Sequence, residues 1–101
     1  MHKFFALYKT PDDVPAFLEH YNNVHAPLAR KIPGLKKLVV NRVTGNAFGG
    51  DPPYFLIAEM QFDSKEDFDA AMASPENKET GRDAMQFAKG LITALIAESD
   101  D

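Results

Sequence analysis

Three segments of this sequence carry apolar side chains at consecutive positions, where a half-buried strand would alternate apolar and polar residues. They span residues 3–9, 54–62 and 91–97. Successive side chains of a strand point to opposite faces of a sheet, so apolar residues on both sides of a strand need cover on both sides. The chain is therefore expected to build a sheet whose two faces are both buried.

Turn and capping signals divide the chain into strands and helices. Asp13 is a suitable N-cap for a helix that tolerates Pro15 in its first turn. Ser64 and Ser74 each precede a further helical stretch, and residues 44–53 form a loop rich in Gly and Pro. The expected elements are a strand at 3–9, a helix from Val14 to about His25, strands at 35–43 and 54–62, helices at 65–73 and 75–89, and a strand at 91–97.

The order strand, helix, strand, strand, helix, strand within 101 residues predicts one domain spanning residues 1–101. Its fold class is α+β: a ferredoxin-like βαββαβ arrangement, with a four-stranded antiparallel sheet and the helices on one face. Helices on one face leave the other exposed, and soluble monomers seldom expose an apolar patch beyond roughly 300–600 Å². A homodimer that joins two copies through this sheet face is the simplest cover. The alternative is a more polar second face, given Asn41, Glu59, Gln61 and Thr93.

Composition excludes several classes of function. A net charge of −4 argues against binding to nucleic acid, which requires clustered Lys and Arg. The absence of Cys excludes disulfides and thiolate chemistry and is consistent with a reducing cytoplasm. No apolar run reaches membrane-spanning length. We therefore expect a cytoplasmic protein without a nucleic-acid or membrane partner.

Tyr21 and His25 are four residues apart, which places them side by side on one face of a helix. Pro27 disfavours a helical conformation at Ala26, so the chain is expected to turn just after His25. His25 is the best candidate for a general acid or base, because an unperturbed pKa of about 6.5 lets imidazole give and take a proton. Tyr21 and Tyr8 are candidate hydrogen-bond donors to a carbonyl or phenol oxygen. The helix is expected to bury Val14, Phe17, Tyr21, Val24 and Leu28.

Glu59 lies within an apolar strand, where a carboxylate is costly unless it is paired or protonated. It is expected either to bond Arg42, Tyr8 or His25, or to serve in the site; the alternative is a half-solvated strand residue. Apolar neighbours would line a pocket suited to aromatic or polyketide-like compounds. The candidate catalytic residues are His25, Tyr21 and Glu59, and the candidate ligand-binding residues are Phe4, Tyr8, Leu28, Arg42, Phe55 and Ile57.

No metal site is expected. His20 and His25 are five residues apart and are expected to point in different directions, and His2 lies near the terminus. Haem ligation by His25 stays open because it needs only one residue, and the cofactor is otherwise unknown. The structural alternative for the whole site is that His25 caps helical carbonyls and Tyr21 is an ordinary core residue.

Several of these residues also form a recognisable pattern that is spread over nearly the whole chain. It consists of Phe17-x-x-x-Tyr21-x-x-x-His25-Ala26-Pro27-Leu28-Ala29, Ile32-Pro33-Gly34-Leu35, Asn41-Arg42-Val43, Glu59 ahead of Phe62-Asp63-Ser64, Ser74-Pro75-Glu76 and Asp83-x-x-x-Phe87. This pattern resembles the EthD-like family of the dimeric α+β barrel superfamily. Asn22 departs from it, because the family often has Trp directly after the tyrosine.

The resemblance implies a dimer with a cavity for a small hydrophobic compound that is aromatic, ether-derived or polyketide-like. The family is named for a protein of ethyl tert-butyl ether degradation. Its superfamily includes monooxygenases, polyketide cyclases, decarboxylases and haem-binding enzymes, which implies oxidoreductase- or cyclase-like activity with His25 as general acid or base. A non-catalytic binding module and a haem-binding barrel are the alternatives, since fold analogy alone does not establish function.

Overall fold

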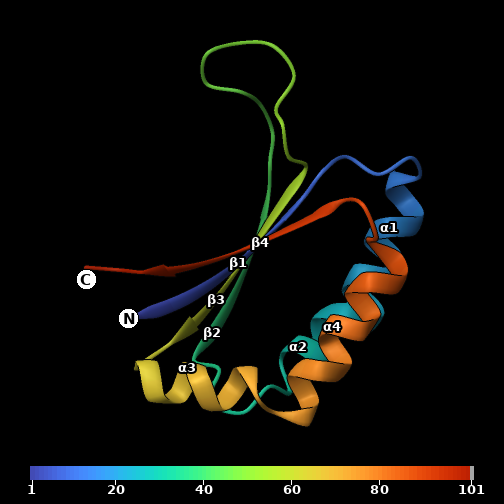
Figure 1. Ribbon diagram of the computed structural model, residues 1–101. Helices are drawn as coiled ribbons and strands as arrows, with labels where there is room; N and C mark the ends of the chain where they lie inside the picture. The colour runs from blue at the N-terminus through green and yellow to red at the C-terminus, as the bar shows by residue number, and fades with distance from the viewer. Residues whose placement is uncertain (101) are drawn as a thin grey trace.

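The structure is a computed structural model that describes residues 1–100, and it consists of one sheet with helices packed on one side (Figure 1). The sheet is antiparallel, in the order β2-β3-β1-β4. This is the ferredoxin-like α+β fold that the sequence predicts. No helix within residues 1–100 has the length and apolar character to cross a membrane. The elements are β1 (His2–Tyr8), α1 (Val14–His20), the π-helix η1 (Tyr21–His25), α2 (Ala26–Ala29), β2 (Lys37–Arg42), β3 (Leu56–Phe62), α3 (Lys65–Met72), α4 (Pro75–Phe87) and β4 (Ile92–Glu98).

Side chains N-cap the longer helices as the sequence indicates. Ser64 accepts a hydrogen bond from the backbone N–H of Asp67, and Ser74 accepts one from that of Asn77. Each bond satisfies a backbone donor that has no partner within its helix. Helix α4 continues through Gly81 without a break.

The first helical stretch does not end after His25, so the predicted turn there was wrong. Ala26 donates its backbone N–H to the carbonyl of Tyr21, five residues earlier, and the chain stays helical through Ala29. Pro27 lacks an N–H and its ring would clash with the carbonyl four residues earlier in a regular α-helix. The wider π-turn accommodates the proline without breaking the helix.

The π-turn also changes which residues are buried. An extra residue in the turn rotates everything after it, so the prediction that Val24 is buried was wrong, and it is 41% exposed. Leu28 is only half-buried. His25, Ala26 and Ala29 face the protein interior in their place.

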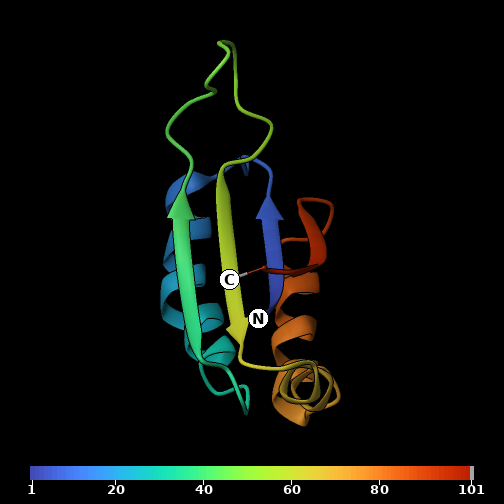
Figure 2. The same cartoon turned by 90° about the vertical axis from the view of Figure 1, so that its left-hand side faces the viewer.

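Figure 2 looks onto the face of the sheet that no helix covers, with the loop between β2 and β3 extending beyond the sheet. The apolar side chains of this face are Phe5, Leu7, Val39, Ile57 and Leu95, which are half-buried or exposed. Among them the Lys3 Nζ atom forms an ion pair with Glu59 at 3.2 Å. The open face therefore combines these apolar side chains with the Lys3–Glu59 pair and with the polar side chains of Lys37, Asn41, Gln61 and Thr93.

Candidate functional site

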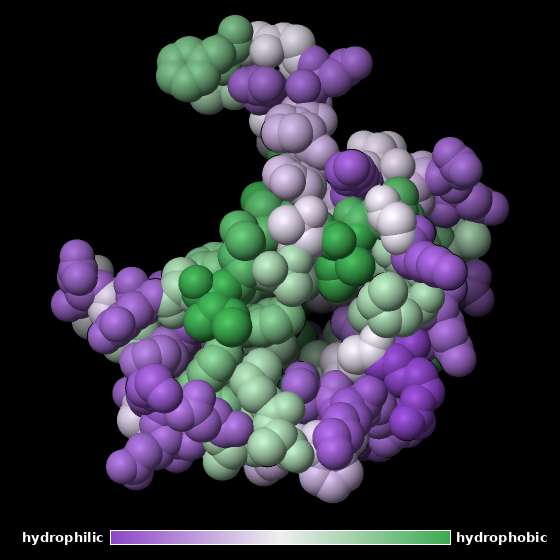
Figure 3. All heavy atoms as spheres, in the orientation of Figure 1, coloured by the Kyte–Doolittle hydropathy of each residue, from purple (hydrophilic) through white to green (hydrophobic). Residues whose placement is uncertain are grey.

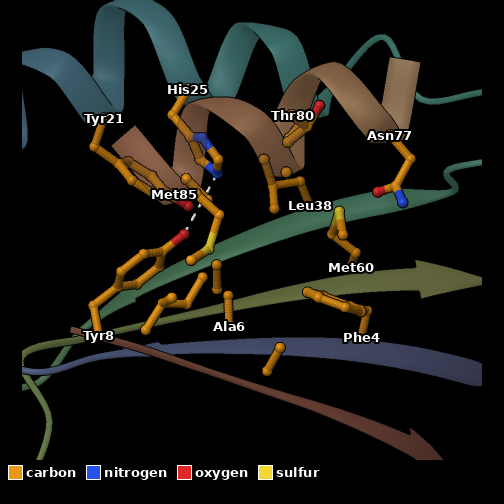
Figure 4. A pocket seen from close by; sticks show the side chains of 16 residues that line it. Phe4, Ala6, Tyr8, Tyr21, His25, Leu38, Met60, Asn77, Thr80 and Met85 are labelled. Atoms are coloured by element: carbon orange, nitrogen blue, oxygen red, sulfur yellow. Dashed lines mark hydrogen bonds between the residues drawn. The ribbon is translucent and has the colours of Figure 1, made fainter. Parts of the chain in front are cut away.

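A cavity of about 420 Å³ lies between the helix-facing side of the sheet and helices η1 and α4. Its walls are apolar over most of their area, and Met85, 56% exposed, stands where it opens to solvent. In the space-filling view, apolar side chains gather around this opening and hydrophilic ones surround them (Figure 3). Three polar residues, Tyr8, Tyr21 and His25, meet at one end of the cavity (Figure 4).

His25 is held by a carboxylate from a distant part of the chain. Its Nδ1 lies 2.9 Å from Oδ2 of Asp83 on α4, while the other oxygen of Asp83 lies 2.8 Å from Nε2 of His20. Because a carboxylate only accepts, both imidazoles donate N–H to it. His25 therefore carries its proton on Nδ1, and its Nε2 is an acceptor on the cavity side, 3.4 Å from the hydroxyl of Tyr8.

Burial decides the protonation states at this end of the cavity. It lowers the pKa of His25, and the hydrogen bond and charge of Asp83 oppose that shift only in part. The imidazole is therefore neutral at neutral pH and can accept a proton on Nε2. Burial also raises the pKa of Tyr8, assisted by Tyr21 and Asp83, and raises the pKa of Tyr21 to about 12 against the opposing charge of Arg30. Both phenols stay protonated and act as donors.

Tyr21 presents an unpartnered hydroxyl to the cavity. The residue is 1% exposed, and its ring is fixed by a stacked contact with Phe17 and an edge contact with Tyr8. Its O–H forms no hydrogen bond within residues 1–100. The hydroxyl lies near the hydroxyl of Tyr8 and the imidazole of His25 (Figure 4). A ligand oxygen at this end of the cavity would receive that hydrogen bond.

Of the residues singled out from the sequence, His25, Tyr21, Tyr8 and Phe4 line this cavity. The other five do not line it. Glu59 and Ile57 are on the opposite face of the sheet, where Glu59 pairs with Lys3 instead of Arg42, Tyr8 or His25.

The remaining predicted residues lie outside the cavity as well. Leu28 is half-buried on α2. The Arg42 guanidinium stacks 4.6 Å from the ring of Phe55, which in turn contacts Phe17 edge-on at the end of the sheet. These contacts lie where the long loop between β2 and β3 leaves and rejoins the sheet.

Sequence reasoning missed the part that Asp83 and His20 take in the site. The prediction that His20 and His25 point in different directions was wrong, because a π-helix brings residues five apart to one side. Asp83 appeared only within the family pattern, and Pro27, two residues after His25, was the available signal for the π-turn. Within residues 1–100 no group of three His, Cys, Asp or Glu is placed to hold a metal ion.

The fold and the apolar cavity between the sheet and its helices define a small α+β protein of the ferredoxin-like type. Residues 9–90 match the model of the EthD domain, and the chain belongs to the EthD family. It is similar to an ethyl tert-butyl ether degradation (EthD) family protein from Bacillus halodurans C-125, with 46% identity over 98% of both chains and a TM-score of 0.92.

Two other proteins extend the comparison. An uncharacterized 11.0 kDa protein of the thcB-thcC intergenic region of Rhodococcus erythropolis is 33% identical over 99% of this chain and 96% of its own length. A dimeric ferredoxin-like protein of unknown function from Thermobifida fusca YX is 20% identical, with a TM-score of 0.67 over 97% of this chain and 90% of its own. The latter shares the fold.

Proposed function

We propose that this protein binds a small, largely apolar compound in the cavity and moves a proton at a carbonyl or phenolic group of that compound through His25. The observation that carries the proposal is the hydrogen bond from Nδ1 of His25 to Asp83, which leaves Nε2 as an acceptor on the cavity side. A neutral imidazole held in position within reach of the proton it removes is the usual arrangement for a general base.

Each polar group then has a role. Asp83 keeps the proton of His25 on Nδ1 and stabilises the imidazolium that forms when Nε2 takes a proton from the ligand. Tyr21 donates its free hydroxyl to the ligand oxygen, where negative charge develops as the proton leaves. Tyr8, 3.4 Å from Nε2 of His25, donates to that nitrogen when no ligand is bound. A positioned base of this kind accelerates proton transfer by about 10²–10⁴-fold.

The test is proton removal from a β-diketone probe, 1-phenyl-1,3-butanedione, followed by NMR as deuterium incorporation between its two carbonyl groups. We expect the protein to accelerate exchange and His25→Asn to lower the rate by about 10²-fold. His2→Asn is the matched control, because His2 packs on Phe68 away from the cavity. Equal exchange rates for the protein and its His25→Asn variant would contradict the proposal.

A non-catalytic carrier is the second candidate. The observation that favours it is the composition of the cavity, which is apolar apart from a few polar side chains and needs no proton transfer to hold a ligand. A carrier would bind the β-diketone in calorimetry without accelerating exchange. His25→Asn would then change the affinity and leave the exchange rate at its background value.

We also propose that two copies associate through the open face of the sheet. The proposal is supported by the apolar residues of that face and by the dimeric assembly named for the ferredoxin-like relative from Thermobifida fusca. Association would cover both the apolar side chains and the Lys3–Glu59 pair. Sedimentation at micromolar concentration tests it, and a stable 11 kDa particle would contradict it.

A further inference from the structure

The end of the cavity opposite His25 holds a single polar group of different character. Asn77, near the start of α4, projects into the cavity beside Met60 and Phe4 (Figure 4). Apart from Thr80, the wall between Asn77 and His25 is apolar, so the two ends are separate polar points in a largely hydrophobic space. A few polar groups placed in this way set the orientation of a ligand.

Hydrogen bonds hold the backbone of Asn77 at the start of α4 and orient its carboxamide. Its Nδ2 donates to the carbonyl of Met72 at 3.2 Å, and its backbone N–H donates to Oγ of Ser74 at 3.1 Å. Only the NH₂ group can donate to a carbonyl, so Oδ1 must point away from Met72. Figure 4 shows it turned into the cavity, and within residues 1–100 it accepts no hydrogen bond.

The far end of the cavity therefore offers Oδ1 of Asn77 as a hydrogen-bond acceptor to which no other group donates. Thr80 also lines the cavity, but its hydroxyl donates to the carbonyl of Glu76 at 2.8 Å and stays turned to its own helix. The near end is the opposite, because the hydroxyl of Tyr21 is a donor without a partner. A ligand that satisfies both ends must accept at one and donate at the other.

We infer that the cavity takes an elongated ligand that carries a carbonyl or phenolic oxygen at the Tyr21 and His25 end and a hydroxyl or amino donor at the Asn77 end. The inference rests on the proposed function, which assigns the oxygen-bearing end of the ligand to His25. The hydrogen bond to Oδ1 of Asn77 distinguishes hydroxylated compounds from equally sized apolar ones. One such hydrogen bond changes affinity by about tenfold.

The experiment compares two pairs of β-diketones by calorimetry. The first pair is 1-(4-hydroxyphenyl)-1,3-butanedione and its 4-methyl analogue, and the second is the longer 6-hydroxy- and 6-methyl-2-naphthyl pair. In at least one pair we expect the hydroxyl member to bind about tenfold more tightly. Asn77→Leu should abolish this preference, and the exposed Asn23→Leu is the matched control that retains it.

Asn77→Ala is a second variant, to be used if Asn77→Leu does not fold. We expect it, too, to bind the hydroxyl and methyl members of each pair with equal affinity. Equal affinity of the two members in every pair for the unaltered protein, weak or absent binding included, would overturn the inference. So would a hydroxyl preference that persists in Asn77→Ala. Neither result bears on deuterium exchange into 1-phenyl-1,3-butanedione, which has no hydroxyl and tests the role of His25 separately.

Discussion

His25 and Asp83 lie 2.9 Å apart, from Nδ1 to Oδ2, although 58 residues separate them in the chain. The second oxygen of the same carboxylate binds His20. One half-buried acid thus joins both histidines of the first helical stretch to α4. It fixes the tautomer of His25, which within residues 1–100 is the only imidazole that lines the cavity.

Asp83→Asn should lower the rate of deuterium exchange by about 10²-fold or more, because an amide cannot stabilise the imidazolium of His25 as a carboxylate does. An amide also accepts from only one of its two atoms, so one imidazole N–H loses its acceptor. We expect the free energy of unfolding to fall by about 1–3 kcal/mol in urea titration. Asp69→Asn, which removes an exposed carboxylate paired with Lys65, is the control and should change neither quantity appreciably.

The free energy of unfolding should decrease as the pH is lowered, and part of this decrease should depend on His25. Burial lowers the pKa of this imidazole in the folded protein below its unfolded value of about 6.5. Between the two pKa values the unfolded chain binds a proton that the folded protein does not, so its free energy of unfolding falls as the solution is acidified through this range. The contribution is fully present above about pH 6.5 and is lost as the pH falls through the folded pKa.

Urea titrations from about pH 7.5 to pH 5 measure this effect as the difference between the protein and His25→Asn, which cannot titrate there. The variant should lose less stability over the interval, because it lacks the imidazole that takes up a proton on unfolding. An equal or greater loss in His25→Asn would contradict the assignment of a lowered pKa to the buried imidazole.

Deleting Asn23, an exposed residue of η1, should convert the π-turn into a regular α-helical turn. His25 would still face the interior, because the deletion removes the residue that made the turn wide. Pro27 would then lie in an α-helix interior, which costs about 3 kcal/mol. Adding Pro27→Ala to the deletion should recover most of that loss in urea titration, and a deletion variant as stable as the parent would refute this account of the proline.

Leu7→Lys should dissociate the proposed dimer. Leu7 is in the central strand β1, pairs with Ile57 and Thr93, and is half-buried on the open face of the sheet. A buried lysine in an apolar interface has no partner for its charge, so we expect sedimentation to show an 11 kDa species at micromolar concentration. Val24→Lys, at an exposed apolar residue on the helical side, should leave the assembly unchanged.

Much of the architecture follows from local patterns. Apolar segments, helix N-caps at Ser64 and Ser74, and the Gly- and Pro-rich loop act over a few residues, so the strands and helices fall within a few residues of their predicted bounds. The neighbouring rings of Tyr21 and His25, 5.4 Å apart, also follow from their spacing in the chain. The turn after His25 was mispredicted because Ala26 keeps right-handed helical dihedral angles, φ −61° and ψ −41°, in front of Pro27, whereas the residue before a proline usually leaves that region.

The sequence by itself determined the βαββαβ order and placed an imidazole and a phenol together on the first helical stretch. Tertiary structure alone decided that the cavity lies against the helices, that Glu59 belongs to the opposite face, and that Asp83 joins His20 and His25. The reason is physical: backbone periodicity and capping depend on near neighbours, whereas a cavity and its hydrogen bonds depend on how distant segments pack. A one-residue change of helical phase, such as the π-turn at Tyr21–His25, redirects every side chain after it.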